Sequence, residues 1–172
     1  QLVMLGENIN SMRRNYAEEL DRQFQKTIES FELPRRDIKL QYYCGWEQDK
    51  SLATVLTENL YNDIKHGYTQ YGPQRAKIDT VINSDNIKYH FSEGQQKIVH
   101  YAIKVAQSEY LKEKLNKKVL FLVDDLSAEL DINNQTKLIR LLENIENQVI
   151  ITTVKDEISK VIEKSYKTIH LE

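Results

Sequence analysis

The sequence predicts an α/β fold, and three features of its 172 residues support this prediction. Residues 119–123 are five apolar residues in a row that end at Asp124 and Asp125. This is typical of a buried parallel strand that carries carboxylates to the edge of a sheet. From Val119 onward the pattern reads strand, helix, strand, helix, strand, which indicates a parallel layer. The chain has only five Gly and two Pro, which favours long elements with few tight turns.

The first predicted segment, residues 1–33, is a helical arm. Apolar residues recur every three or four positions from Leu5 to Phe31, which is the spacing of one face of an amphipathic helix. We expect Pro34 to end this helix, because the residue before a proline is pushed out of the helical region.

The second segment, residues 34–110, is predicted to be a lobe of strands and helices. Ser51 is the expected N-cap of one helix and Gly67 its C-cap. The remaining expected elements are a strand over 37–46, a hairpin of strands 78–82 and 87–91 around a turn at 84–86, and a helix after Ser92 that is buried on several sides.

The third segment, residues 111–172, is the predicted parallel layer. Its expected elements are a charged connection over 111–118, the strand 119–123, a helix through Leu138 and Ile145, a strand 149–151, a helix over 158–162 and a final strand 166–171.

Composition excludes several classes of protein. The net charge of −2 predicts no general attraction to nucleic acid or to an anionic membrane. The single cysteine, Cys44, excludes a disulfide framework and favours a cytoplasmic protein. The longest aliphatic run is far too short to span a membrane. The chain opens at Gln1 without an initiator Met or a helix cap, so we expect a fragment cut from a longer protein.

Asp124 and Asp125 are the strongest candidates for chemistry. A Mg²⁺ ion bound with a nucleotide usually keeps several waters, so one protein carboxylate is often sufficient. The neighbouring acid can then orient or deprotonate the attacking water. The alternative is a solvated turn after a strand, and the following Leu126–Asp131 favours the functional interpretation.

Ser92 and Gly94 precede a predicted helix, where a hydroxyl and backbone N–H groups can hold a phosphate. The alternative is ordinary helix capping by Ser92, with Glu93 as a favourable acid in the first turn. No Gly-x-x-x-x-Gly-Lys-Ser/Thr loop occurs in the sequence. We therefore expect the chain alone to bind ATP poorly.

Three of these motifs resemble, in order, the signature motif, Walker B and D-loop of ABC-type ATPases. They are Ser-x-Gly-Gln-Gln at 92–96, the strand ending in Asp124-Asp125, and Ser-x-x-Leu-Asp at 127–131. Further stretches look like the C-terminal half of the RecF family of bacterial recombination mediators. These are Gly45–Glu47, Tyr71–Ala76, Gly94–Lys97, Lys104–Gln107 and Asp124–Asp131.

The resemblance implies the C-terminal part of an ABC-type (P-loop NTPase) head with a helical arm and a β-hairpin lobe, without the Walker A half. It also implies that Asp124 binds Mg²⁺ and that Asp125 occupies the catalytic-base position. The resemblance implies that Ser92 and Gly94 contact the γ-phosphate of ATP held by the partner subunit, and that Gln95 also binds ATP. It places Ser127 and Asp131, two further ATP-binding residues, in the D-loop at the dimer seam.

The resemblance further implies ATP-dependent homodimerisation, slow hydrolysis and binding to DNA at single-strand/double-strand junctions or gaps. Its implied partners are RecR and RecO, in recombinational repair, replication and the SOS response. The alternative is a non-catalytic module whose helical arm and α/β lobe dock a protein partner. An SMC-type ATPase fits less well, because the sequence has no long heptad coiled coil.

The sequence departs from these families at two places. The RecF pattern Gly-Pro-His-Arg-Ala-Asp appears here as Gly72–Lys77, so its last acid is a base. Thr152 and Thr153 stand where transporter ATPases place a switch His. Basic residues that could contact DNA phosphates, or be scattered surface charge, are Arg13, Arg14, Arg35, Arg36, Arg75 and Lys77.

Overall fold

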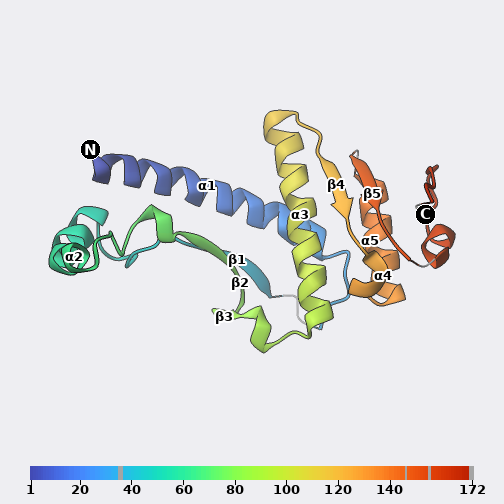
Figure 1. Ribbon diagram of the computed structural model, residues 1–172, viewed down its shortest axis with the longest axis horizontal. Coiled ribbons are helices and arrows are strands. Elements are labelled where there is room, and N and C mark those ends of the chain that lie inside the picture. Colours follow the sequence, from blue (N-terminus) through green and yellow to red (C-terminus); the bar gives the residue numbers. More distant parts are fainter. Residues whose placement is uncertain (35–36, 146, 155, 171–172) are drawn as a thin grey trace. The chain divides into compact units, whose positions relative to one another are not determined.

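The computed structural model describes residues 1–34, 37–145, 147–154 and 156–170 (Figure 1). Contacts divide the chain into two compact units. Unit 1 comprises Gln1–Arg22 and Asp37–Ile87, and unit 2 comprises Gln23–Arg36 and Lys88–Glu172. The division into 1–33, 34–110 and 111–172 stays a prediction. Within the described residues, no helix combines the length and apolar character that crossing a membrane requires.

Helix α1 spans Leu2–Ile28 and confirms the predicted long helix. The expectation that Pro34 ends it is wrong, because the helix stops at Ile28. The N–H groups of Ser30 and Phe31 donate to carbonyls only three residues back, which tightens the last turn. The side chain of Phe31 is then buried, so packing and not proline geometry closes the helix.

Unit 1 contains a three-stranded antiparallel sheet in the order β1-β2-β3, formed by β1 Ile38–Tyr43, β2 Lys77–Ile82 and β3 Asp85–Asn86. The main partner of β2 is β1, from Ile38 opposite Ile82 to Tyr43 opposite Lys77. The predicted return strand 87–91 is wrong. Asn83 and Ser84 both have positive φ and form the two-residue hairpin turn, and the return strand β3 ends at Asn86 because the chain then enters a 3₁₀ helix. Residues Ile87–Tyr89 form a 3₁₀ helix, η2, and Ile87 is buried.

Helix α2, Leu52–His66, has the predicted caps. The Ser51 hydroxyl accepts a hydrogen bond from the Thr54 N–H, and Gly67 closes the helix at φ 78°. Leu52 and Val55 are buried in a small core with Cys44, Trp46, Tyr42 and Leu56. The far end of the expected apolar stripe is exposed, since Leu60 and Ile64 have 57% and 73% of their surface accessible.

Gly45 and Gly72 bring two of the RecF-like stretches together. The Gly72 N–H donates to the Gly45 carbonyl oxygen at 3.2 Å. Gly45 has φ +97°, and a Cβ placed there would collide with the Gly72 carbonyl oxygen and crowd the Ala76 nitrogen. Gly72 leads into the 3₁₀ helix η1, Pro73–Arg75. Glycine at position 45 is therefore required by the backbone of unit 1.

Unit 2 contains the predicted parallel pair. Strands β4, Leu120–Val123, and β5, Gln148–Ile151, pair in parallel from Leu120 opposite Gln148 to Val123 opposite Ile151. The chain between them forms α4, Leu126–Glu129, and α5, Ile132–Asn144 (Figure 1). Helix α3, Glu93–Leu115, contacts α5. It extends into the expected connection 111–118, because Asn116 caps it only after Leu115.

The last two predicted elements differ from the structure. The expected helix 158–162 is a 3₁₀ helix, η3, over Asp156–Lys160. The predicted strand 166–171 is wrong over residues 166–170, which carry no strand, and Leu171 lies outside the described residues. Tyr166 and Ile169 are 52% and 72% exposed. Because these apolar side chains pack against no buried surface, the alternating pattern does not produce a strand here.

One face of the two-stranded parallel sheet is uncovered. Leu120 and Leu122 of β4 and Ile150 of β5 are 51%, 70% and 46% exposed, and they alternate with more buried neighbours. Parallel sheets are normally covered on both faces. The β4–β5 pair thus has the surface of an interior part of a larger sheet.

We predict that Gly45→Ala destabilises the protein more than Gly67→Ala does. Gly67 also has positive φ, but a Cβ there would meet no atom within 4 Å. The Gly67 change should therefore cost only the ~1 kcal/mol of left-handed strain. Gly45→Ala adds a backbone collision, for a further ~1–3 kcal/mol. Urea denaturation of the two variants measures the difference, and equal losses would contradict the close approach.

Candidate functional site

The acidic doublet lies at the carboxyl end of β4, as predicted, and both carboxylates are exposed. Thr152, directly after β5, bonds to it. The Thr152 hydroxyl donates to Asp124 Oδ1 at 2.5 Å and accepts from the Asp125 N–H at 2.9 Å. The parallel register of β4 and β5 produces this contact, because it ends both strands at the same sheet edge.

Asp125 turns the chain from β4 into α4. Its φ and ψ of 42° and 54° lie in the left-handed region, which Asp tolerates better than most residues. The Ser127 hydroxyl donates to Asp125 Oδ1 at 3.1 Å. The structure therefore joins Asp124, Asp125 and Ser127, three of the predicted site residues, with Thr152 in one hydrogen-bonded group.

Asp131 caps α5, a role that the sequence reasoning missed. Its Oδ1 accepts from the N–H groups of Asn133 and Asn134, each at 3.1 Å. The Asn134 backbone hydrogen bond is the main cause that lowers the pKa of Asp131 below its ordinary value of 3.8. An Asp ahead of a periodic apolar run is an N-cap pattern, so the signal was present in the sequence.

Ser92 and Gln95 form a capping box at the start of α3. The Ser92 hydroxyl accepts from the Gln95 N–H at 3.4 Å, and Gln95 Oε1 accepts from the Ser92 N–H at 3.0 Å. The capping alternative for Ser92 is thus realised in the structure. Gly94 has no conformational need for glycine, and an added Cβ would meet nothing within 4 Å.

The signature residues and the acidic doublet form two separate groups. No hydrogen bond among the described residues links Ser92, Gly94 or Gln95 to Asp124 or Asp125. A phosphate contact by the first group would therefore be distinct from a cation contact by the second.

The donor set suits a Mg²⁺ ion that arrives with a nucleotide. In the part of the chain that the structure describes, no cluster of three or more His, Cys, Asp or Glu could hold a metal ion. Mg²⁺ in nucleotide sites keeps several waters and takes phosphate oxygens, so it needs only one or two carboxylates. The exposed Asp124 carboxylate at a strand end meets this requirement.

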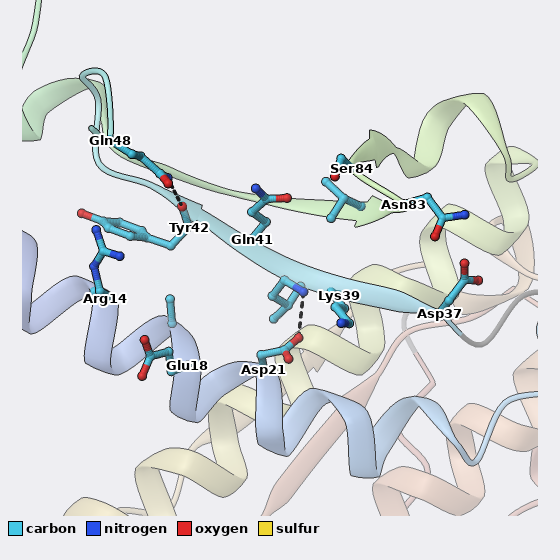
Figure 2. A pocket seen from close by; sticks show the side chains of 13 residues that line it. Arg14, Glu18, Asp21, Asp37, Lys39, Gln41, Tyr42, Gln48, Asn83 and Ser84 are labelled. Atoms are coloured by element: carbon cyan, nitrogen blue, oxygen red, sulfur yellow. Dashed lines mark hydrogen bonds between the residues drawn. The ribbon is translucent and has the colours of Figure 1, made fainter. Parts of the chain in front are cut away.

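A cleft in unit 1 is lined by none of the predicted ATP or metal residues. It is a cleft of about 500 Å³ along α1 and β1 (Figure 2), lined by Arg14, Ala17, Glu18, Asp21, Asp37, Lys39, Leu40, Gln41, Tyr42, Gln48, Val81, Asn83 and Ser84. Its charges are mixed, so it does not favour a phosphate. Asp21 Oδ1 accepts the N–H of Leu40 at 2.7 Å, which satisfies a donor of edge strand β1.

Two of the candidate DNA-contacting residues are engaged within unit 1. Arg13 donates to the Pro73 carbonyl oxygen at 2.5 Å. Lys77, at the position of the RecF acid, pairs with Asp79 at 2.6 Å and lies 5.2 Å from the centre of the Tyr43 ring. The hydrogen bond to Asp79 raises the pKa of Lys77. Arg35 and Arg36 lie outside the described residues.

The mixed α/β fold resembles part of an ABC-type head. No protein-family model matches the chain. A structure of an SMC head bound to the C-winged helix domain of ScpA matches 87% of this chain and 38% of its own, with a TM-score of 0.51 and 15% identity, which shows the fold alone.

The chain is a homologue of RecF. It is 38% identical over 157 residues to the DNA replication and repair protein RecF of a Marinomonas species, covering 91% of this chain and 42% of that protein. A structure of the recombination mediator protein RecF with ATP, in the RecFOR pathway, matches 91% of this chain and 43% of its own. Its TM-score is 0.69 and its identity is 27%. The chain thus spans less than half of the relatives it matches.

We predict that Asp131→Ala lowers the free energy of unfolding by about 1 kcal/mol near neutral pH, because α5 loses its N-cap. Because the pKa of Asp131 is lowered in the folded state, its carboxylate stabilises the fold at pH values above the ordinary pKa of 3.8. This stabilisation is lost as the pH falls through the folded-state pKa. The difference in the free energy of unfolding between wild type and Asp131→Ala should therefore become smaller at acidic pH. Denaturation from pH 7 to pH 3 measures it, with Asp131→Asn, which keeps an acceptor oxygen, as the control. A constant difference would contradict the charged cap.

Proposed function

We propose that this chain is the C-terminal part of a RecF-like, ATP-dependent DNA-binding protein that acts in cytoplasmic recombinational repair and replication-gap processing. The observation that carries the proposal is the acidic doublet, Asp124-Asp125, at the end of β4 in a fold that matches RecF with ATP. In the proposed protein, ATP-driven dimerisation is the switch and slow hydrolysis resets it.

An upstream segment of the same longer protein supplies the Walker A loop in this proposal. In the proposed protein this segment also covers Leu120, Leu122 and Ile150. Their exposure in the chain supports the proposal, because parallel sheets are normally covered on both faces. Without the loop, the chain lacks the Lys and the backbone cradle for the phosphates. We therefore assign ATPase activity to the intact protein only.

Asp124 holds the Mg²⁺ in the proposed site, directly or through water. The ion, when bound, would neutralise negative charge on the phosphates of the nucleotide. Asp125 orients and deprotonates the attacking water, and its bond from Ser127 fixes its carboxylate. Both carboxylates are exposed in the chain, so they are accessible to a nucleotide that the upstream segment presents.

Ser92 and Gly94 contact the γ-phosphate of the ATP held by the partner subunit, and Gln95 also binds the nucleotide. Ser127 and Asp131 lie at the dimer seam. The Ser92 hydroxyl accepts the Gln95 N–H, which leaves its own hydrogen to donate to a phosphate oxygen. The space around Gly94 supports a close approach from outside, since no atom of the described residues lies within 4 Å of a Cβ placed there. The proposed partners are DNA at junctions or gaps and RecR- and RecO-type proteins.

The second candidate is a docking module without catalysis. One observation favours it: helix α2 exposes Leu60, Tyr61 and Ile64, with 57%, 80% and 73% of their surfaces accessible. Large exposed apolar groups often mark protein-binding surfaces. In this alternative the acidic doublet is only a solvated turn.

We predict that Asp125→Asn in the intact protein leaves ATP binding and dimerisation intact and stops turnover. Asn also tolerates the left-handed conformation of position 125, so the fold should survive the change. Phosphate release measures turnover, and Asp49→Asn, at another exposed carboxylate, is the control. Hydrolysis at the wild-type rate would remove Asp125 from the catalytic role.

We predict that Gly94→Ala keeps or raises stability yet prevents ATP-dependent dimerisation. Alanine is the better helix former by up to ~1 kcal/mol, and among the described residues no atom lies within 4 Å of its methyl group. Light scattering of the intact protein with and without Mg-ATP measures the mass, and Ser92→Arg should also abolish the shift. An unchanged wild-type mass with ATP demonstrably bound would remove the sandwich dimer and favour the docking module.

A further inference from the structure

Thr152 makes four hydrogen bonds to four consecutive residues at the end of β4. Its N–H donates to the Val123 carbonyl at 2.9 Å, and its carbonyl accepts from the Leu126 N–H at 3.2 Å. Its hydroxyl donates to Asp124 Oδ1 at 2.5 Å and accepts from the Asp125 N–H at 2.9 Å. A single side chain of the neighbouring strand thus contacts both members of the acidic doublet.

The partners of the Thr152 hydroxyl determine which hydrogen bond it donates and which it accepts. A backbone N–H can only donate, so the Thr152 oxygen accepts from Asp125. Its one hydrogen is then available for the Asp124 carboxylate, which it holds by Oδ1. This bond limits rotation of the carboxylate and leaves Oδ2 as the oxygen to present to a cation.

The backbone and the side chain of Thr152 have separable functions. Any residue except proline at position 152 can keep the bonds to Val123 and Leu126, because both use main-chain atoms. The two bonds made by the hydroxyl reach only Asp124 and Asp125. The hydroxyl therefore acts on the doublet and not on the strand pairing.

We propose that Thr152 is the positioning residue of the acidic doublet. Its hydroxyl aims the Asp124 carboxylate at the nucleotide-bound Mg²⁺, and by accepting the Asp125 N–H it holds Asp125 in its left-handed conformation. The proposal rests on the proposed ATPase function. A side chain that orients a metal-binding carboxylate is expected to change metal affinity by about 10- to 100-fold.

The test measures Mn²⁺ binding, as a spectroscopic substitute for Mg²⁺, to the intact protein with a slowly hydrolysed ATP analogue. Electron paramagnetic resonance of Mn²⁺ gives the affinity without turnover. Thr152→Val should weaken Mn²⁺ binding by about tenfold or more and leave metal-free nucleotide binding unchanged. Thr152→Ser, which restores the hydroxyl, should keep the wild-type affinity.

Thr136→Val is the matched control. Among the described residues the Thr136 hydroxyl donates to the Ile132 carbonyl within α5, so its loss removes a threonine hydroxyl of the same unit and leaves the bonds of the doublet in place. This variant should bind Mn²⁺ like wild type. Should Thr152→Val fail to fold, Thr152→Ala carries the same comparison, because it also removes the hydroxyl and places a smaller group there.

The outcomes separate this inference from the proposed function. Wild-type affinity in Thr152→Val, together with loss of Mn²⁺ in Asp124→Asn, would overturn the role of Thr152 and leave the metal site standing. A Thr152→Ser variant as weak as Thr152→Val would assign the effect to packing of the methyl group and also overturn the role. Absence of nucleotide-dependent Mn²⁺ binding in the wild type would overturn the proposed function itself.

Discussion

The candidate site depends on the parallel pairing of β4 with β5. In a parallel ladder the carboxyl ends of neighbouring strands meet at one edge, and the crossover through α4 and α5 makes this arrangement possible. The pairing places Thr152 against Asp124 and Asp125, although 28 residues separate Thr152 from Asp124. Without it, the doublet would be two exposed acids in a loop.

Two of the predicted site residues also cap helices with their side chains. Ser92 caps α3 and Asp131 caps α5, so both already have a structural role before any nucleotide is considered. A loss of activity on replacing either residue would therefore mix stability with function. Gly94 and Thr152 differ in this respect. No described atom lies close enough to Gly94 to require a glycine there, and the main-chain hydrogen bonds of Thr152 do not depend on its hydroxyl.

The predictions that succeeded rest on local patterns. The long first helix, the Ser51 and Gly67 caps of α2 and the apolar strand before Asp124 are each encoded by residues within a few positions of one another. The strands predicted over 87–91 and 166–171 failed because apolar alternation does not specify a partner strand. The 3₁₀ helix Ile87–Tyr89 takes the place of the first, and the exposed Tyr166 and Ile169 give the second no buried face.

The sequence by itself determined the helical periodicity, the caps, the acidic strand end and the resemblance to RecF, because each is a property of neighbouring residues or of motif order. Only the tertiary structure decided that Gly45 meets Gly72 and that Thr152 holds the doublet. The physical reason is that both contacts join distant segments. Their geometry follows from how those segments pack and, at Thr152, from the register of strand pairing, which no local pattern in the chain specifies.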